Sequence, residues 1–238
     1  MKKEIKLYNG KISIWFDEEK HIFTDKDGDR ILGVTSITNI IDKSPVLIPW
    51  AIKMMGNYLV YYAGQPITRE LIDEAKREWR KVKEEAADIG SLIHEFAAQW
   101  ITLKKKPEIP EDEQVRNGAI AFMKWVKDTG VEFDNSEKII YSKKHNFAGI
   151  LDADGHINKE HCIIDFKSSS GIYPEMYLQL TGYWLAREEE TKIKYNKGYI
   201  VQFGKIDGEF HVVEITREEY KKNKEAFLAA LTLKKYGK

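Results

Sequence analysis

The spacing of apolar residues changes at Gly130, and this change constrains the fold more than any other feature of the sequence. Before it, apolar residues recur every three to four positions from Thr68 to Trp100 and again from Glu113 to Thr129, which predicts two amphipathic helices. After it, apolar and polar residues alternate in residues 138–142, 147–157 and 161–168, which predicts three consecutive strands. We therefore expect helices packed on a sheet.

The flanking segments extend this α/β pattern. Helical spacing returns at residues 173–189 and 216–233, and residues 197–203 and 209–215 read as a strand pair. Residues 11–37 alternate around polar turns and predict a small β-meander, followed by a helix that begins at Pro49. No linker interrupts the chain, so we expect one domain over 1–238 with residues 1–45 as an N-terminal β elaboration.

Composition excludes several classes of protein. Hydrophobic residues make up 42% of the chain, which excludes a disordered protein. The one cysteine, Cys162, cannot form an intrachain disulfide, a cysteine-based zinc site or a four-cysteine iron–sulfur cluster. No phosphate-binding GxxxxGK[ST] loop is present, so we expect no nucleotide cofactor. No apolar stretch reaches 18 residues and the N-terminus lacks a signal-peptide pattern, so we expect a cytoplasmic protein that does not enter the membrane.

Charge leaves nucleic acid open as a partner. The 38 basic residues balance the 38 acidic ones, so only a local field could attract a phosphate backbone.

The strand at 161–168 carries the first candidate chemistry. Its alternation places Asp165 and Lys167 on one face, and a hairpin register could bring Asp152 of the preceding strand next to Asp165. Two carboxylates beside an ammonium group form the kind of site that Mg²⁺ or Mn²⁺ prefers, and phosphodiester hydrolysis uses such a set. An exposed ion pair between Asp165 and Lys167 is the simpler interpretation of the same spacing.

Two helices carry further candidates. His94 lies one turn after Gly90 in the long helix and could complete a metal site, although a histidine of the core or the surface fits equally. Gln179 and Tyr183 are four residues apart, so their side chains leave one face of the helix at 173–189. They could contact a phosphate, or they could be a solvated and a core residue.

The order of these motifs resembles a known family. Over roughly residues 86–203, the chain resembles the RecB-type branch of the PD-(D/E)xK nuclease superfamily. The resemblance rests on GSLIH, which ends at His94, GILD at 149–152, DFK at 165–167 and QLTGY at 179–183. The resemblance implies a mixed central sheet flanked by helices, a restriction-endonuclease-like core. Leu151 stands where the superfamily name has proline, and Ser168 where threonine is frequent. The single cysteine makes the chain similar to the cluster-free, stand-alone members such as phage exonucleases.

The resemblance also implies roles for individual residues. His94, Asp152, Asp165 and the backbone carbonyl of Phe166 would bind Mg²⁺ or Mn²⁺, and Lys167 would be the catalytic lysine. Gln179 and Tyr183 would support the site and hold the DNA backbone. Lys143 and Lys144, in the turn before the GILD strand, are candidate phosphate contacts, with solvation of a surface turn as the other interpretation.

The expected function is therefore a metal-dependent DNA nuclease in a bacterial or phage-infected cell. We expect an exonuclease acting on single-stranded DNA or on DNA ends in preference to an endonuclease, with room for a protein partner in replication, repair or recombination. One alternative is a non-catalytic DNA-end-binding or assembly module on the same fold. Another is a different metal hydrolase acting on small phosphoesters.

Overall fold

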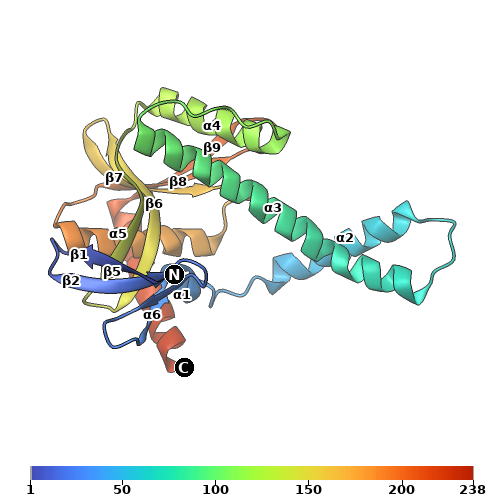
Figure 1. Ribbon diagram of the computed structural model, residues 1–238, viewed down its shortest axis with the longest axis horizontal. Coiled ribbons are helices and arrows are strands. Elements are labelled where there is room, and N and C mark those ends of the chain that lie inside the picture. The colour runs from blue at the N-terminus through green and yellow to red at the C-terminus, as the bar shows by residue number, and fades with distance from the viewer. Residues whose placement is uncertain (1, 238) are drawn as a thin grey trace. The chain divides into compact units, whose positions relative to one another are not determined.

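Within residues 2–237, which the computed structural model describes, nine strands form one mixed β-sheet. The strands are β1 (Lys2–Leu7), β2 (Ile12–Asp17), β3 (Ile22–Thr24), β4 (Arg30–Gly33), β5 (Glu132–Ser142), β6 (Phe147–Ile157), β7 (Glu160–Lys167), β8 (Lys197–Phe203) and β9 (Phe210–Thr216). The helices are α1 (Val34–Thr38), α2 (Ser44–Tyr61), α3 (Arg69–Leu103), α4 (Glu113–Thr129), α5 (Pro174–Thr191) and α6 (Arg217–Tyr236) (Figure 1). The predicted α/β class with a mixed sheet flanked by helices is confirmed and is consistent with a restriction-endonuclease-like core.

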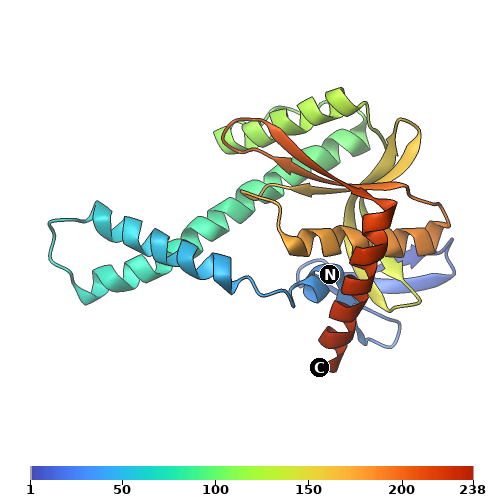
Figure 2. The same cartoon turned by 180° about the vertical axis from the view of Figure 1, so that it is seen from behind.

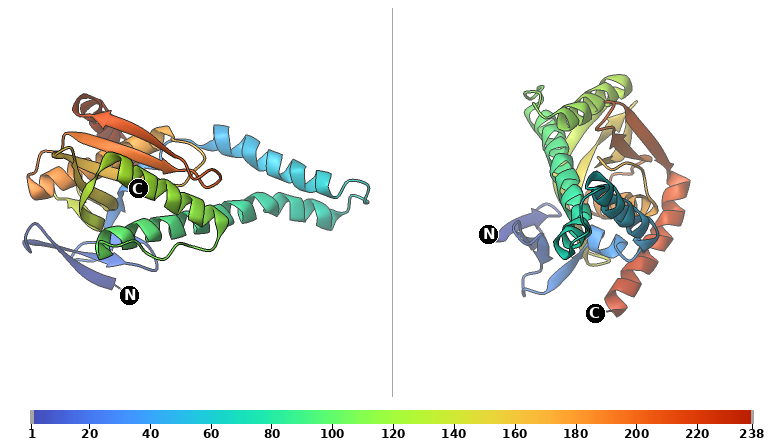
Figure 3. Two further views of the ribbon diagram at one scale, coloured as in Figure 1. Left: turned by 90° about the horizontal axis from the view of Figure 1, so that it is seen from above. Right: turned by 90° about the vertical axis from the view of Figure 1, so that its right-hand side faces the viewer.

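Helices cover both faces of the sheet. Alternation along β7 sends Ile163 and Phe166 to opposite faces. Ile163 belongs to the same core cluster as Leu180 of α5 and Phe227 of α6, and these two helices lie in front of the sheet in Figure 2. On the other face, Phe166 packs edge-on against Phe122 of α4 with 5.7 Å between ring centroids. Figure 3 shows α4 alongside β8 and β9.

The pairing of β6 leaves a gap that positions the candidate site. β5 pairs with one edge of β6 along residues 147–156. The other edge is divided, because β4 runs parallel to Phe147 and Ala148 while β7 is antiparallel to residues 153–157. No strand of the described chain pairs with residues 149–152 on that edge, and these residues are the GILD motif. Asp152 therefore lies where the sheet opens between β4 and β7.

The N-terminal third differs from the prediction in its details. An additional strand, β1, precedes the predicted meander and pairs with β2. After Gly33 the chain turns into helix α1 instead of continuing as a strand. Helix α2 begins at Ser44, because Pro45 occupies its first turn, and Pro49 lies inside it. The meander also joins the main sheet through the parallel pair of β4 and β6, a pairing between distant parts of the sequence.

The described chain divides into two compact units, residues 2–40 with 93–237, and Ile41–Leu92. The first unit contains the whole sheet and every candidate site residue. The second contains α2 and the first part of α3, where the hydroxyl of Tyr58 donates to Glu74 Oε2 at 3.0 Å. The single domain over residues 1–238 stays a prediction. Among the described helices, none combines the length and the apolar character needed to span a membrane.

Candidate functional site

The hairpin of β6 and β7 sets Asp152 and Asp165 in register. The last pair of its ladder is Ala153 opposite Ile164, so the next facing positions in this register are Asp152 and Asp165. The ladder ends there, and the backbone N–H of Phe166 donates to Asp152 Oδ2 at 2.8 Å. The register that the sequence suggested is therefore the one in the structure.

Asp165 is a buried carboxylate with unused hydrogen-bonding capacity. Its side chain is 0% exposed, and Lys167 Nζ lies 2.5 Å from Oδ2. Even so, neither carboxylate oxygen makes a well-oriented hydrogen bond to any described residue. Burial raises the pKa of Asp165 to about 6 although Lys167 opposes this shift. Apart from Lys167, no described residue donates to this buried carboxylate, so lone pairs remain that a divalent cation would fill.

His94 reaches the same cluster from α3. Its Nδ1 lies 3.6 Å from Asp152 Oδ1, and its ring meets the ring of Phe166 edge-on, 6.3 Å away. Burial alone would lower the pKa of His94, but the Asp152 carboxylate more than offsets this, so the pKa is raised. Burial would likewise raise the pKa of Asp152, and His94, Lys167 and the Phe166 amide outweigh it, so this pKa is lowered.

Gln179 and Tyr183 lie on the adjoining face of α5. Gln179 Nε2 donates to the Tyr183 hydroxyl at 2.8 Å, and Tyr183 is buried with 4% of its surface exposed. Burial, with added repulsion from Asp165 and Asp152, holds the pKa of Tyr183 well above its usual value. A Cβ at Gly149 would stand 2.8 Å from the Tyr183 ring, so only glycine lets the ring lie this close to β6.

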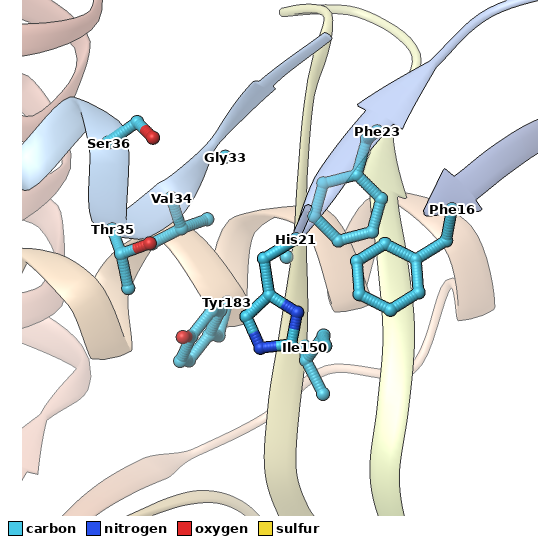
Figure 4. A pocket seen from close by; sticks show the side chains of 10 residues that line it. Phe16, His21, Phe23, Gly33, Val34, Thr35, Ser36, Ile150 and Tyr183 are labelled. Atoms are coloured by element: carbon cyan, nitrogen blue, oxygen red, sulfur yellow. The ribbon is translucent and has the colours of Figure 1, made fainter. Parts of the chain in front are cut away.

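A pocket of about 200 Å³ opens beside Tyr183 (Figure 4). The rings of Phe16, Phe23 and His21 and the ring of Tyr183 line it, and Gly149 of β6 is also part of the lining. Phe16 and Phe23 stack with 4.7 Å between centroids. Strands β2 and β3 and the turn between them thus supply the aromatic wall of a cavity that Tyr183 also lines.

The two predicted lysines of the β5–β6 turn are not part of this cluster. Lys143 and Lys144 precede Phe147, the first residue of β6, so they lie at the opposite end of the 147–152 segment from Asp152, about 16 Å along the strand. The backbone N–H of Lys144 donates to Glu189 Oε1 at 2.8 Å, and both lysine side chains are exposed. A DNA contact at this turn stays a prediction and would lie away from the acidic cluster.

One acidic residue of the site was missed by the sequence analysis. Glu137 of β5 falls between Ser136 and Lys138, which pair with Ala153 and Leu151, so it lies opposite Asp152. Its φ is 48°, a left-handed conformation that is unusual for a side chain of this size. Glu137 is exposed at the surface, and partial desolvation together with the Asp152 charge raises its pKa. No motif marked Glu137, because a local backbone irregularity places it there.

The donors present fit a hard divalent cation. Asp152 and Asp165 offer carboxylate oxygens, His94 offers an imidazole nitrogen, and the unsatisfied oxygens of Asp165 leave room for a positive charge. These residues would hold Mg²⁺ or Mn²⁺ next to Lys167.

The known proteins that are similar to this chain are solved structures of low sequence identity. No protein-family model and no curated protein matches the chain. The alkaline exonuclease LHK-Exo of Laribacter hongkongensis is similar in structure, both in a complex with dAMP and in a second crystal structure, with 17% identity and TM-scores of 0.33 and 0.32. Each match covers 63% of this chain and 89% of the exonuclease. The structure of SSO0001 is similar at 12% identity and a TM-score of 0.33, over 76% of this chain and 84% of that one.

Proposed function

We propose that the chain is a Mg²⁺- or Mn²⁺-dependent DNA nuclease of the RecB-type PD-(D/E)xK branch, and that it acts as an exonuclease on single-stranded DNA or DNA ends. One observation carries the proposal. Asp165 is fully buried, has no well-oriented hydrogen bond to a described residue, and lies in register with Asp152 and beside Lys167. A buried structural ion pair is stable only when further hydrogen bonds satisfy its oxygens, and apart from Lys167 no described residue donates to Asp165.

Each residue of the cluster has a distinct task in this proposal. A bound Mg²⁺ or Mn²⁺ would polarise the scissile phosphate and lower the pKa of a water molecule. Lys167 holds its ammonium group at Asp165, where it can orient the attacking water and offset negative charge that develops on the phosphate. His94 would bind the ion through its imidazole, beside Asp152, with 3.6 Å between Nδ1 and Asp152 Oδ1.

The adjoining residues would hold the DNA strand. The amide nitrogen of Gln179 donates to the Tyr183 hydroxyl, and its amide oxygen is a second polar group. Both residues lie on α5, and Tyr183 is close enough to Asp165 and Asp152 for their charges to raise its pKa. The pocket beside Tyr183 presents ring faces of Phe16, Phe23 and His21, and aromatic faces bind bases of single strands with little sequence preference. A base of the substrate strand would enter there while its phosphate reaches Asp165.

A cleavage time course tests the proposal. Linear DNA labelled at the 5′ or the 3′ end and a circular single strand are incubated with Mg²⁺, Mn²⁺ or EDTA. We expect metal-dependent loss of both linear strands, no reaction in EDTA and survival of the circle, because an exonuclease requires a free end. Cleavage of the circle would show that the enzyme is an endonuclease and not an exonuclease. Binding of DNA without cleavage under either metal would refute catalysis and favour the non-catalytic end-binding module.

A further inference from the structure

A second group of metal-binding side chains lies at the other end of the β6–β7 hairpin. His156 of β6 and His161 of β7 face each other in the ladder. The connection between the strands is a two-residue turn in which Asn158 and Lys159 have φ of 52° and 68°, as tight hairpin turns require. This turn fixes the register, and the two imidazole rings lie 4.2 Å apart, centroid to centroid.

A carboxylate from the neighbouring strand completes the group. The ladder between β5 and β6 slips between Phe133 and Asn135, so Asp134 is the extra residue of a β-bulge, a device that re-aims a side chain. Asp134 Oδ2 lies 3.4 Å from His156 Nδ1. Gly155 lets the backbones of β5 and β6 lie this close together, since a Cβ at residue 155 would stand 2.1 Å from the Glu132 carbonyl oxygen.

The geometry of the three side chains suits one ion. One ligand atom each from Asp134, His156 and His161 lies within 4.8 Å of the other two. Ligands at about 2.1 Å around a tetrahedral zinc ion are about 3.4 Å apart, so small side-chain rotations would close the site. Nδ1 of His161 is buried and has no hydrogen-bond partner among residues 2–237, and an unsatisfied buried nitrogen is costly unless something binds it.

We propose that Asp134, His156 and His161 form a second metal site, which takes a borderline transition-metal ion of the Zn²⁺ type. Two imidazoles with one carboxylate suit Zn²⁺, Co²⁺ or Ni²⁺, whereas Mg²⁺ prefers sites in which oxygen ligands predominate, as they do in the acidic cluster. The site is separate from the acidic cluster, because His156 lies four residues after Asp152 on β6, about 13 Å along the strand. A bound ion would tie β5 to the hairpin that positions Asp152 and Asp165.

The test uses protein in which the acidic cluster is disabled. In the Asp152→Asn, Asp165→Asn double variant, Co²⁺ or Zn²⁺ is titrated and followed by calorimetry and, for Co²⁺, by visible absorption. We expect one equivalent to bind and the melting temperature to rise with metal concentration, since a ligand that binds only the folded state stabilises it. Adding His161→Gln should weaken binding by about 100-fold or more and abolish the absorption band.

Two further variants keep the result interpretable. Asp134→Asn changes an exposed side chain and should weaken binding without unfolding the protein. His211→Gln removes an exposed histidine of β9 that is not in the cluster and should leave binding unchanged. No binding by the double variant, or equal binding with and without the Asp134 and His161 changes, would overturn the proposal while leaving the nuclease proposal untouched.

Discussion

We expect Asp165→Asn to lower the rate of DNA cleavage by at least about 1,000-fold, which corresponds to roughly 4 kcal/mol of lost transition-state stabilisation. The amide has nearly the shape of the carboxylate but no charge, so it is a much weaker ligand for a divalent cation. Cleavage rates with saturating Mn²⁺ give the result. Asp128→Asn, at an exposed position near the end of α4, is the matched control and should retain wild-type activity.

The same variant should not be less stable than the wild type in EDTA. Burial raises the pKa of Asp165 from 3.8 to about 6, so the folded state favours the protonated form more than the unfolded state does. Its favourable contribution is complete below pH 3.8 and is lost as the pH rises through about 6. The melting temperature of the variant relative to wild type should therefore be higher at pH 8 than at pH 4.5. A marked loss of stability at pH 8 would indicate that Asp165 is a structural partner of Lys167.

The second large effect concerns Lys167. We expect Lys167→Ala to lower kcat by about 100- to 1,000-fold, the size of effect seen when one group that stabilises a transition-state charge is removed. The ammonium group is 2.5 Å from Asp165 Oδ2, but it has no lone pair and cannot be a metal ligand. The affinity for Mn²⁺ should therefore not fall in the variant. Cleavage kinetics measured beside a Mn²⁺ binding titration separate the two quantities.

Lys194→Ala removes an exposed lysine between α5 and β8 and serves as the control. If Lys167→Ala keeps full kcat, the lysine has no catalytic task. If it loses kcat and Mn²⁺ affinity together, its role is to shape the cluster.

The parts of the site that depend on strand period could be predicted from the sequence. Alternation placed Asp165 with Lys167, and a hairpin placed Asp152 opposite Asp165, because both follow from a repeat of two residues. The spacing of apolar residues likewise predicted the helix that carries His94. In the structure, His94 Nδ1 lies 3.6 Å from Asp152 Oδ1.

The parts that depend on backbone irregularity could not be predicted. Glu137 enters the site through a positive φ, and Asp134 through a β-bulge, and neither leaves a signal in residue type. The parallel pairing of β4 with β6 joins segments more than a hundred residues apart. The aromatic pocket depends on this pairing, so it could not be predicted from the sequence either. The facing pair of His156 and His161 was accessible in principle, because a two-residue turn at Asn158 and Lys159 fixes that register.

The location of Mn²⁺ in crystals grown with the ion would show directly whether the acidic cluster binds metal. We expect an anomalous scattering peak in contact with the carboxylates of Asp152 and Asp165, at about 2.1 Å from their oxygens, in the wild type and its loss in Asp165→Asn. A peak confined to Asp134, His156 and His161, or no peak with Lys167 still against Asp165, would rule out a metal-dependent nuclease site at the acidic cluster.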